Sequence, residues 1–186
     1  VRNTIGYNAA FIVLGIIFGV LVAVLLDIVH NKYFVKLYQG TLFLPYFLSW
    51  IVVSYVTHAL FQYDKGLINH LVGMFGGNKI SFYSEPKYWP LIFITASVWK
   101  GIGNNSLIYY GTILSISPEL YEAASLEGCG FFKKFWYITL PHLKPTIAIL
   151  FIMAVGGIFR SDYGLFYYLP KDSGGLYAAT DVLDTY

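Results

Sequence analysis

The sequence contains a run of apolar residues long enough to cross a lipid bilayer. From Ile5 to Leu26 no side chain carries a charge, so 22 consecutive residues are uncharged. A helix rises about 1.5 Å per residue and the hydrocarbon core is about 30 Å thick, so this run spans it. Of the 186 residues, 57% are hydrophobic and 12% are charged, against about 25% charged in ordinary soluble domains. We therefore expect an all-α, multi-pass membrane protein.

Three further apolar stretches predict three more membrane-spanning helices. The second stretch contains Pro45, which is expected to start or kink its helix. The third is interrupted only by Lys100. The fourth is short, so its helix either continues to about Leu165 or is reshaped by a break near Gly156 and Gly157. The expected spans are residues 5–29, 37–62, 88–116 and 145–165, with outer loops over 63–87 and 166–186 and a further loop over 117–144.

Small residues recur every fourth position along the first span. Gly15, Gly19 and Ala23 fall on one face of the expected helix. In lipid, such a face lets a second helix backbone come close, because packing replaces the hydrophobic effect as the driving force. The alternative is that glycine is simply common in membrane helices.

Charge and cysteine content exclude several kinds of site. Twelve basic residues against ten acidic ones give a net charge of +2, too small and too scattered for a nucleic-acid partner. The single cysteine, Cys129, excludes an intrachain disulfide and a cysteine-rich metal site. The four histidines are scattered and form no HExxH pattern, so we expect no metal site.

The loop over 117–144 carries a helix, a glycine and a second helix. Ser117 and Pro118 predict a helix start, and Gly128 predicts its left-handed end. The loop suits docking into a groove on a partner protein, because small residues allow close approach and an adjacent glutamate supplies directional charge. The alternative is an amphipathic hairpin on the bilayer surface. The second helix is expected to have an apolar stripe of Phe131, Phe132, Phe135 and Trp136, and to be closed by Leu140 and Pro141.

A longer motif runs through the same loop. Its residues are Glu122, Ala123, Ala124, Gly128, Ile138, Leu140 and Pro141. This motif resembles the EAA motif of the permease subunits of binding-protein-dependent ABC importers. The run from Pro118 to Pro145 is similar to the carbohydrate branch of that family, which is related to the maltose-importer permeases. Residues 44–50, 97–100, 159–166 and 180–186 resemble its polysaccharide-type subgroup in Gram-positive bacteria.

The resemblance implies four of six spans of a permease in the bacterial plasma membrane, with one span before Val1 and one after Tyr186. The loop over 117–144 would be a cytoplasmic coupling loop that docks into an ATP-binding subunit, with Glu122 paired to a basic residue and Gly128 holding the bend. The implied partners are a pair of ATP-binding subunits, a second permease subunit, an extracellular solute-binding lipoprotein and membrane lipids.

The chain itself is expected to be neither an enzyme nor a cofactor-binding protein. The resemblance implies that ATP is bound and hydrolysed by the partner chain. The nearest approach to a Walker A sequence, Gly73 to Lys79, has Asn78 in place of the second glycine and Ile80 in place of Ser or Thr.

Polar residues inside the second and third spans are candidates for a solute pathway. An ammonium group near the bilayer centre costs about 2.5–3.5 kcal/mol on insertion scales, so Lys100 should face protein or water. The alternative is that Gly101 and Gly103 break the helix and that Lys100 pairs with a carboxylate or with backbone carbonyls. For His58, the alternative is a hydrogen-bonded packing role. The candidates are Trp99, Lys100, Asn104, Asn105, Tyr55 and His58.

We therefore predict a permease subunit of an ATP-driven ABC importer for a carbohydrate, either an oligosaccharide or a polysaccharide fragment. Two alternatives stay open. One is a permease of the same superfamily for a non-sugar solute, and the other is a membrane scaffold protein that transports nothing.

Overall fold

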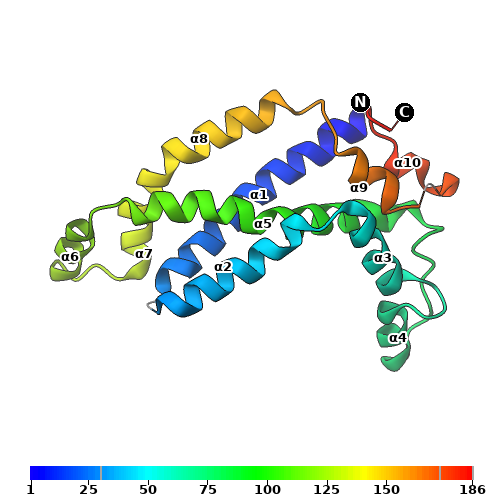
Figure 1. Ribbon diagram of the computed structural model, residues 1–186, viewed down its shortest axis with the longest axis horizontal. Coiled ribbons are helices and arrows are strands. Elements are labelled where there is room, and N and C mark those ends of the chain that lie inside the picture. The colour runs from blue at the N-terminus through cyan, green and yellow to red at the C-terminus, as the bar shows by residue number, and fades with distance from the viewer. Residues whose placement is uncertain (30, 172, 186) are drawn as a thin grey trace. The chain divides into compact units, whose positions relative to one another are not determined.

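The computed structural model describes residues 1–29, 31–171 and 173–185, and the regular structure in these ranges is helical throughout (Figure 1). The all-α prediction is therefore confirmed. The chain divides into a first unit, Val1–Phe11, Phe47–Ser97 and Gly157–Tyr186, and a second unit, Ile12–Tyr46 and Val98–Gly156. The outer loop expected over 166–186 and the motif over 180–186 include positions outside the described residues. One of the four histidines, His30, also lies outside them.

The helices differ greatly in length. They are α1 (Arg2–Ile28), α2 (Lys32–Phe47), α3 (Trp50–Phe61), α4 (Leu67–Met74), α5 (Trp89–Leu114), α6 (Pro118–Leu126), α7 (Phe131–Lys134), α8 (Leu140–Gly156), α9 (Tyr163–Tyr168) and α10 (Tyr177–Thr180). Two 3-10 turns, Pro86–Tyr88 and Gly174–Leu176, and a π-helical segment, Phe135–Thr139, complete the regular structure of the described residues.

Aromatic side chains form the core of the first unit. Trp89 and Phe93 of α5 and Phe166 of α9 are buried, and the rings of Phe93 and Phe166 lie 4.7 Å apart. Such ring pairs add about 0.5–1.5 kcal/mol beyond the burial of their area. The two ends of the chain meet at this unit, because the backbone N–H of Leu183 donates to the Thr4 hydroxyl at 3.0 Å (Figure 1).

The short helix α9 is held by a side-chain cap. Asp162 accepts a hydrogen bond from the backbone N–H of Gly164 at 3.0 Å and another from the Trp50 indole at 2.6 Å. A Cβ on Gly164 would lie 2.9 Å from Trp50 Cγ, so this contact requires glycine.

Because α8 ends at Gly156, the fourth apolar helix does not continue to Leu165. The break near Gly156 is the alternative that the structure supports.

In the second unit, the small-residue face of α1 packs against α5. A Cβ on Gly19 would lie 2.9 Å from Tyr109 Cε2, and Ala23 is completely buried against Tyr109, Ile113 and Leu143. The spacing of small residues therefore marks a helix contact, as the sequence analysis expected.

The second expected span, residues 37–62, is two helices rather than one. Helix α2 ends at Phe47 just after Pro45, and α3 begins at Trp50. Proline disfavours a continuous helix because it lacks an N–H and crowds the preceding turn. Ser49 then starts α3 by accepting a hydrogen bond from the backbone N–H of Val52 at 3.4 Å.

Helix α5, in contrast, is continuous through Gly101 and Gly103, so the expected alternative of a break at these glycines is wrong. Gly103 has a different role. A Cβ at this position would lie 2.8 Å from Phe43 Cα of α2, so the absence of a side chain lets the two backbones approach closely.

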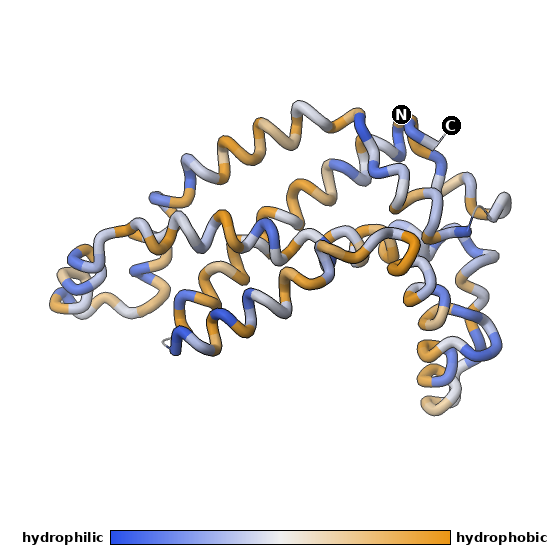
Figure 2. Tube along the Cα trace, in the orientation of Figure 1, coloured by the Kyte–Doolittle hydropathy of each residue, from blue (hydrophilic) through white to orange (hydrophobic). Residues whose placement is uncertain are grey.

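Among the described residues, two continuous helices have the length and hydropathy of a membrane span. They are Arg2–Ile28 and Phe131–Gly156, and a third span results if α2 and α3 are counted together. Figure 2 shows hydrophobic positions along α1 and α8 and hydrophilic ones near their ends. Helix α5 has 26 residues, but polar side chains such as Lys100, Asn104 and Asn105 lower its hydropathy. The described residues thus contain fewer clear spans than the four expected.

The second helix of the loop expected over 117–144 is not closed by Leu140 and Pro141. Instead, α7, the π-helical segment and α8 form one helix, Phe131–Gly156, of 26 residues. The backbone N–H of Leu140 donates to the carbonyl of Phe135, five residues earlier. We infer that this widened turn allows Pro141 to lie inside the helix. In an ordinary helix interior, the proline ring would collide with the carbonyl four residues before it. The loop expected over 117–144 therefore ends inside a helix that continues to Gly156.

Candidate functional site

The bend of the 117–144 loop has the geometry that its sequence predicts. Gly128 has a φ of +72°. Its N–H donates to the Ser125 carbonyl at 3.0 Å, and the N–H of Cys129 donates to the Ala124 carbonyl at 2.9 Å. This pair of bonds is the Schellman arrangement that ends a helix at a left-handed residue. At the other end of α6, Ser117 occupies the position before the helix but makes no side-chain capping bond.

Two side-chain hydrogen bonds join α6 to the helix that follows. The hydroxyls of Tyr121 and Thr139 lie 2.9 Å apart, and Lys134 Nζ donates to Ser125 Oγ at 2.6 Å. Burial raises the pKa of Tyr121 above its ordinary value, so this hydroxyl stays neutral at physiological pH. Tyr121 and Thr139 were not predicted to interact, because no local sequence pattern pairs residues across the bend.

The outer face of the 117–144 loop is apolar and exposed. Leu126 is 90% exposed and Phe132 is 75% exposed. Glu122 and Ala123 are also exposed, whereas Ala124 is half-buried. Exposed apolar side chains next to charged ones mark an interaction surface.

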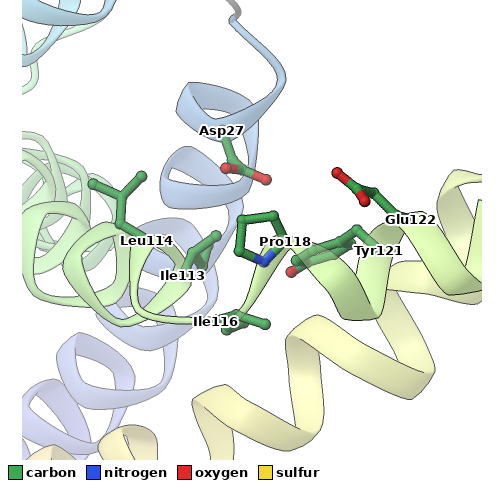
Figure 3. A pocket seen from close by; sticks show the side chains of 7 residues that line it. All are labelled: Asp27, Ile113, Leu114, Ile116, Pro118, Tyr121 and Glu122. Atoms are coloured by element: carbon green, nitrogen blue, oxygen red, sulfur yellow. The ribbon is translucent and has the colours of Figure 1, made fainter.

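Glu122 borders a hollow of about 330 Å³ at the start of α6. Figure 3 shows the carboxylates of Glu122 and Asp27 directed towards this hollow from opposite sides, with Pro118 and Tyr121 between them. Two facing carboxylates favour a basic side chain between them, because a charge-assisted hydrogen bond to a carboxylate is stronger than a neutral one. Asp27 was not predicted to belong to this site, since it lies in the last turn of α1, far from the motif along the chain.

The remaining motif residues lie apart from this hollow. Ile138, Leu140 and Pro141 belong to the helix that follows the bend, where Ile138 and Leu140 are half-buried and Pro141 is exposed. None of the three lines the hollow beside Glu122. The motif therefore contributes to two regions of the 117–144 loop rather than to one cluster.

Lys100 binds a backbone carbonyl. Its ammonium donates to the carbonyl of Tyr46 at 2.8 Å and lies 5.4 Å from the centre of the Tyr46 ring. The last carbonyls of a helix lack partners within it, and they carry the negative end of its dipole. Lys100 thus stabilises the end of α2. Pairing with backbone carbonyls was the expected alternative to a place in the solute pathway.

The other pathway candidates are divided between the two units. In the second unit, Asn105 packs against α1, because a Cβ on Gly15 would lie 3.3 Å from its amide nitrogen. In the same unit, Trp99 is exposed and Asn104 is half-buried. In the first unit, the His58 ring packs edge-on against Tyr83 at 5.3 Å.

Tyr55 lies on α3 in the first unit and is exposed. It borders a hollow together with Tyr167, Tyr168 and Lys171, which the sequence analysis did not name. The one available signal was the density of tyrosines after the fourth apolar stretch. Within the described ranges, no group of three or more His, Cys, Asp or Glu side chains could hold a metal ion.

Comparison with known proteins gives consistent results. A model of the family described as "Binding-protein-dependent transport system inner membrane component" matches residues 9–161. The polygalacturonan/rhamnogalacturonan transport system permease protein YteP of Bacillus subtilis is 34% identical over 167 residues, which are 90% of this chain and 51% of the relative. The chain thus spans about half the length of this relative.

Solved structures of a bacterial ABC transporter that imports the acidic polysaccharide alginate have the same fold. The matched chain has a TM-score of 0.93 and 28% sequence identity, over 100% of this chain and 64% of that one. This transporter is also known in complex with a periplasmic protein that carries an alginate pentasaccharide. Because the family match covers most of its length, the chain belongs to the family of binding-protein-dependent transport system inner membrane components.

Proposed function

We propose that the chain is part of the permease of an ATP-driven ABC importer for oligosaccharides or polysaccharide fragments, and that residues 117–144 couple it to an ATP-binding subunit. The observation that carries this proposal is the exposed helix–glycine–helix surface with Glu122 beside a second carboxylate, Asp27. A basic side chain of the ATP-binding subunit would enter between these carboxylates. The family membership and the polysaccharide importers among its relatives support the choice of solute.

The coupling loop is built to pass a displacement on to membrane helices. The residues between the end of α5 at Leu114 and the start of α6 at Pro118 form a short linker, and the second helix of the loop continues into α8 without a break. The hydroxyls of Thr112 and Thr146 lie 3.1 Å apart and join α5 to α8. Closure of an attached ATP-binding pair would therefore move both helices together.

The remaining partners follow from the same proposal. ATP would be bound and hydrolysed by the ATP-binding subunits, so the chain itself would hold no cofactor and catalyse no reaction. A second permease subunit would complete the pathway in the bacterial plasma membrane. An extracellular solute-binding lipoprotein would deliver the sugar, as supported by the alginate importer in complex with its periplasmic protein.

Uptake by the complete transporter tests this function. The full-length permease would be reconstituted in proteoliposomes with its second permease, ATP-binding subunits and binding protein, and uptake of labelled oligosaccharides would be measured with and without ATP. We expect uptake that requires ATP and every subunit. A complex that binds its subunits but takes up no saccharide would contradict the proposal and favour a scaffold, and uptake of non-sugar solutes alone would favour the other alternative.

A further inference from the structure

A second hollow, of about 480 Å³, lies in the first unit between α3 and the end of α9 with the turn that follows it. Its size falls within the range of about 300–1,000 Å³ found for small-molecule sites. The residues that line it come from the N-terminal half of α3 and from the end of α9. They are Ile51, Ser54, Tyr55, Tyr167, Tyr168 and Lys171.

Tyrosine rings form much of the wall of this hollow. Tyr55 is 67% exposed although it lies inside an apolar stretch. The rings of Tyr167 and Tyr168 lie 5.4 Å apart at 83° to each other, so they present surfaces in two directions. Aromatic faces of this kind stack on the apolar faces of sugar rings, while phenol hydroxyls bond to sugar hydroxyls.

Lys171 gives the hollow its charge. Its ammonium lies 5.8 Å from the centre of the Tyr55 ring. Its backbone has a φ of +54°, the left-handed region that non-glycine residues seldom adopt. The N–H of Lys171 donates to the Tyr168 carbonyl at 3.3 Å and so holds this turn. Strained backbone of this kind concentrates at ligand-binding sites.

Among the described residues, three other lysines lie over tyrosine rings, and each has a second partner. Lys100, over the Tyr46 ring, donates to the Tyr46 carbonyl at 2.8 Å. Lys79 lies over Tyr63 and pairs with Asp64 at 3.5 Å. Lys87 lies over Tyr88 and pairs with Glu85 at 2.5 Å. Within the described part of the chain, Lys171 has no such ion pair with a carboxylate, and it is the one charged residue among those that line the hollow.

We propose that this hollow binds a uronic acid unit of an acidic oligosaccharide, with the sugar ring against the tyrosines and the carboxylate at Lys171 Nζ. The inference rests on the proposed function and adds the charge of the substrate to it. A neutral sugar would use the tyrosine rings but would leave the ammonium without a counter-charge. A carboxylate would form a charge-assisted hydrogen bond, which is about twice as strong as a neutral one.

Direct titration of the assembled transporter tests the proposal. The complex of full-length permeases and ATP-binding subunits would be placed in nanodiscs of zwitterionic lipid and titrated calorimetrically with tetragalacturonate and with a neutral galactose tetrasaccharide. We expect Lys171→Met to weaken tetragalacturonate binding about tenfold and to leave the neutral sugar unaffected. Lys171→Arg should restore binding, since it restores the charge. Tyr55→Ala should weaken both ligands, whereas Tyr55→Phe should retain the ring contact.

The matched control is Lys79→Met, which removes a lysine from another tyrosine ring outside the hollow and should leave both affinities unchanged. Equal tetragalacturonate affinity of wild type and Lys171→Met would overturn the proposal. So would an absence of tetragalacturonate binding to wild type in zwitterionic nanodiscs. Binding of anionic-lipid vesicles that Lys171→Met abolishes would then show that the hollow holds a lipid headgroup instead. Another outcome is that every variant takes up the neutral sugar with ATP and shows no preference for uronate. That result would agree with the proposed importer and would refute only this inference. No saccharide uptake at all would refute the proposed function instead.

Discussion

Replacing Gly128 with alanine is expected to weaken the association between the coupling loop and an ATP-binding subunit. Gly128 has a φ of +72°, and a side chain in this region costs about 1–2 kcal/mol. A Cβ at this position would meet no other atom within 4 Å, so the cost comes from the backbone and not from a collision. This free energy reduces the population of the bent loop about five- to thirtyfold relative to its relaxed forms.

The measurement is the affinity of the purified full-length permease for its ATP-binding subunits, determined by microscale thermophoresis. Gly128→Ala should lower the affinity by no more than the stated factor. Gly128→Asn should lower it less, because asparagine tolerates the left-handed conformation. Gly130→Ala is the matched control, since Gly130 lies two positions away with a φ of −72° and with open space around its Cβ position.

Two results would refute this reasoning. Wild-type affinity in Gly128→Ala would show that docking does not depend on the bend. An affinity of Gly128→Asn below that of Gly128→Ala would show that side-chain volume at the interface, and not backbone conformation, controls the association.

Three further predictions concern the stability of the purified permease, and the second also concerns the KM of the complete transporter. Gly19→Ala should lower the melting temperature, because its Cβ would press on Tyr109 at a cost of about 1–3 kcal/mol. Gly6→Ala on the same helix should not lower it, since that position is open. Equal melting temperatures of the two variants would argue against the α1–α5 contact. Lys100→Met should lower the melting temperature, because the hydrogen bond to the end of α2 is lost, and should leave the KM for solute unchanged. A changed KM would indicate that Lys100 contributes to the solute pathway. Asn69→Ala should expose residues 62–88 to proteolysis. The buried Asn69 side chain donates to three backbone carbonyls and accepts from one N–H in this segment. Unchanged digestion rates would contradict that role.

The predictions from sequence succeed where one residue has a strong local preference. Gly128 was expected to end α6 in a left-handed conformation, and Gly19 and Ala23 were expected to meet another helix, because glycine's freedom and small size act over short distances. The predictions fail at Pro141 and at Gly103. Proline was expected to end a helix that in fact continues past a π-helical turn, and the alternative in which Gly101 and Gly103 break α5 is wrong, because Gly103 serves close packing.

The candidate site was predictable only in part, for a similar reason. Glu122 belongs to a continuous motif, whereas Asp27 reaches the same hollow from the end of another helix. Tyr55 was named from its place in an apolar stretch, but its neighbour Lys171 comes from the far end of the chain. Such pairs arise from tertiary packing, which no local sequence pattern encodes.

Charge reversal at the coupling loop tests the central claim most directly. Glu122 and Glu119 are both exposed on α6, but only Glu122 lines the hollow that contains Asp27. ATP-driven oligosaccharide uptake would be measured in cells that produce equal membrane amounts of wild type, Glu122→Lys and the matched variant Glu119→Lys. If Glu122 receives a basic side chain of the ATP-binding subunit, uptake falls at least about tenfold in Glu122→Lys, because a favourable charge pair becomes a repulsive one, and stays near the wild-type level in Glu119→Lys. Full uptake by Glu122→Lys would contradict the account.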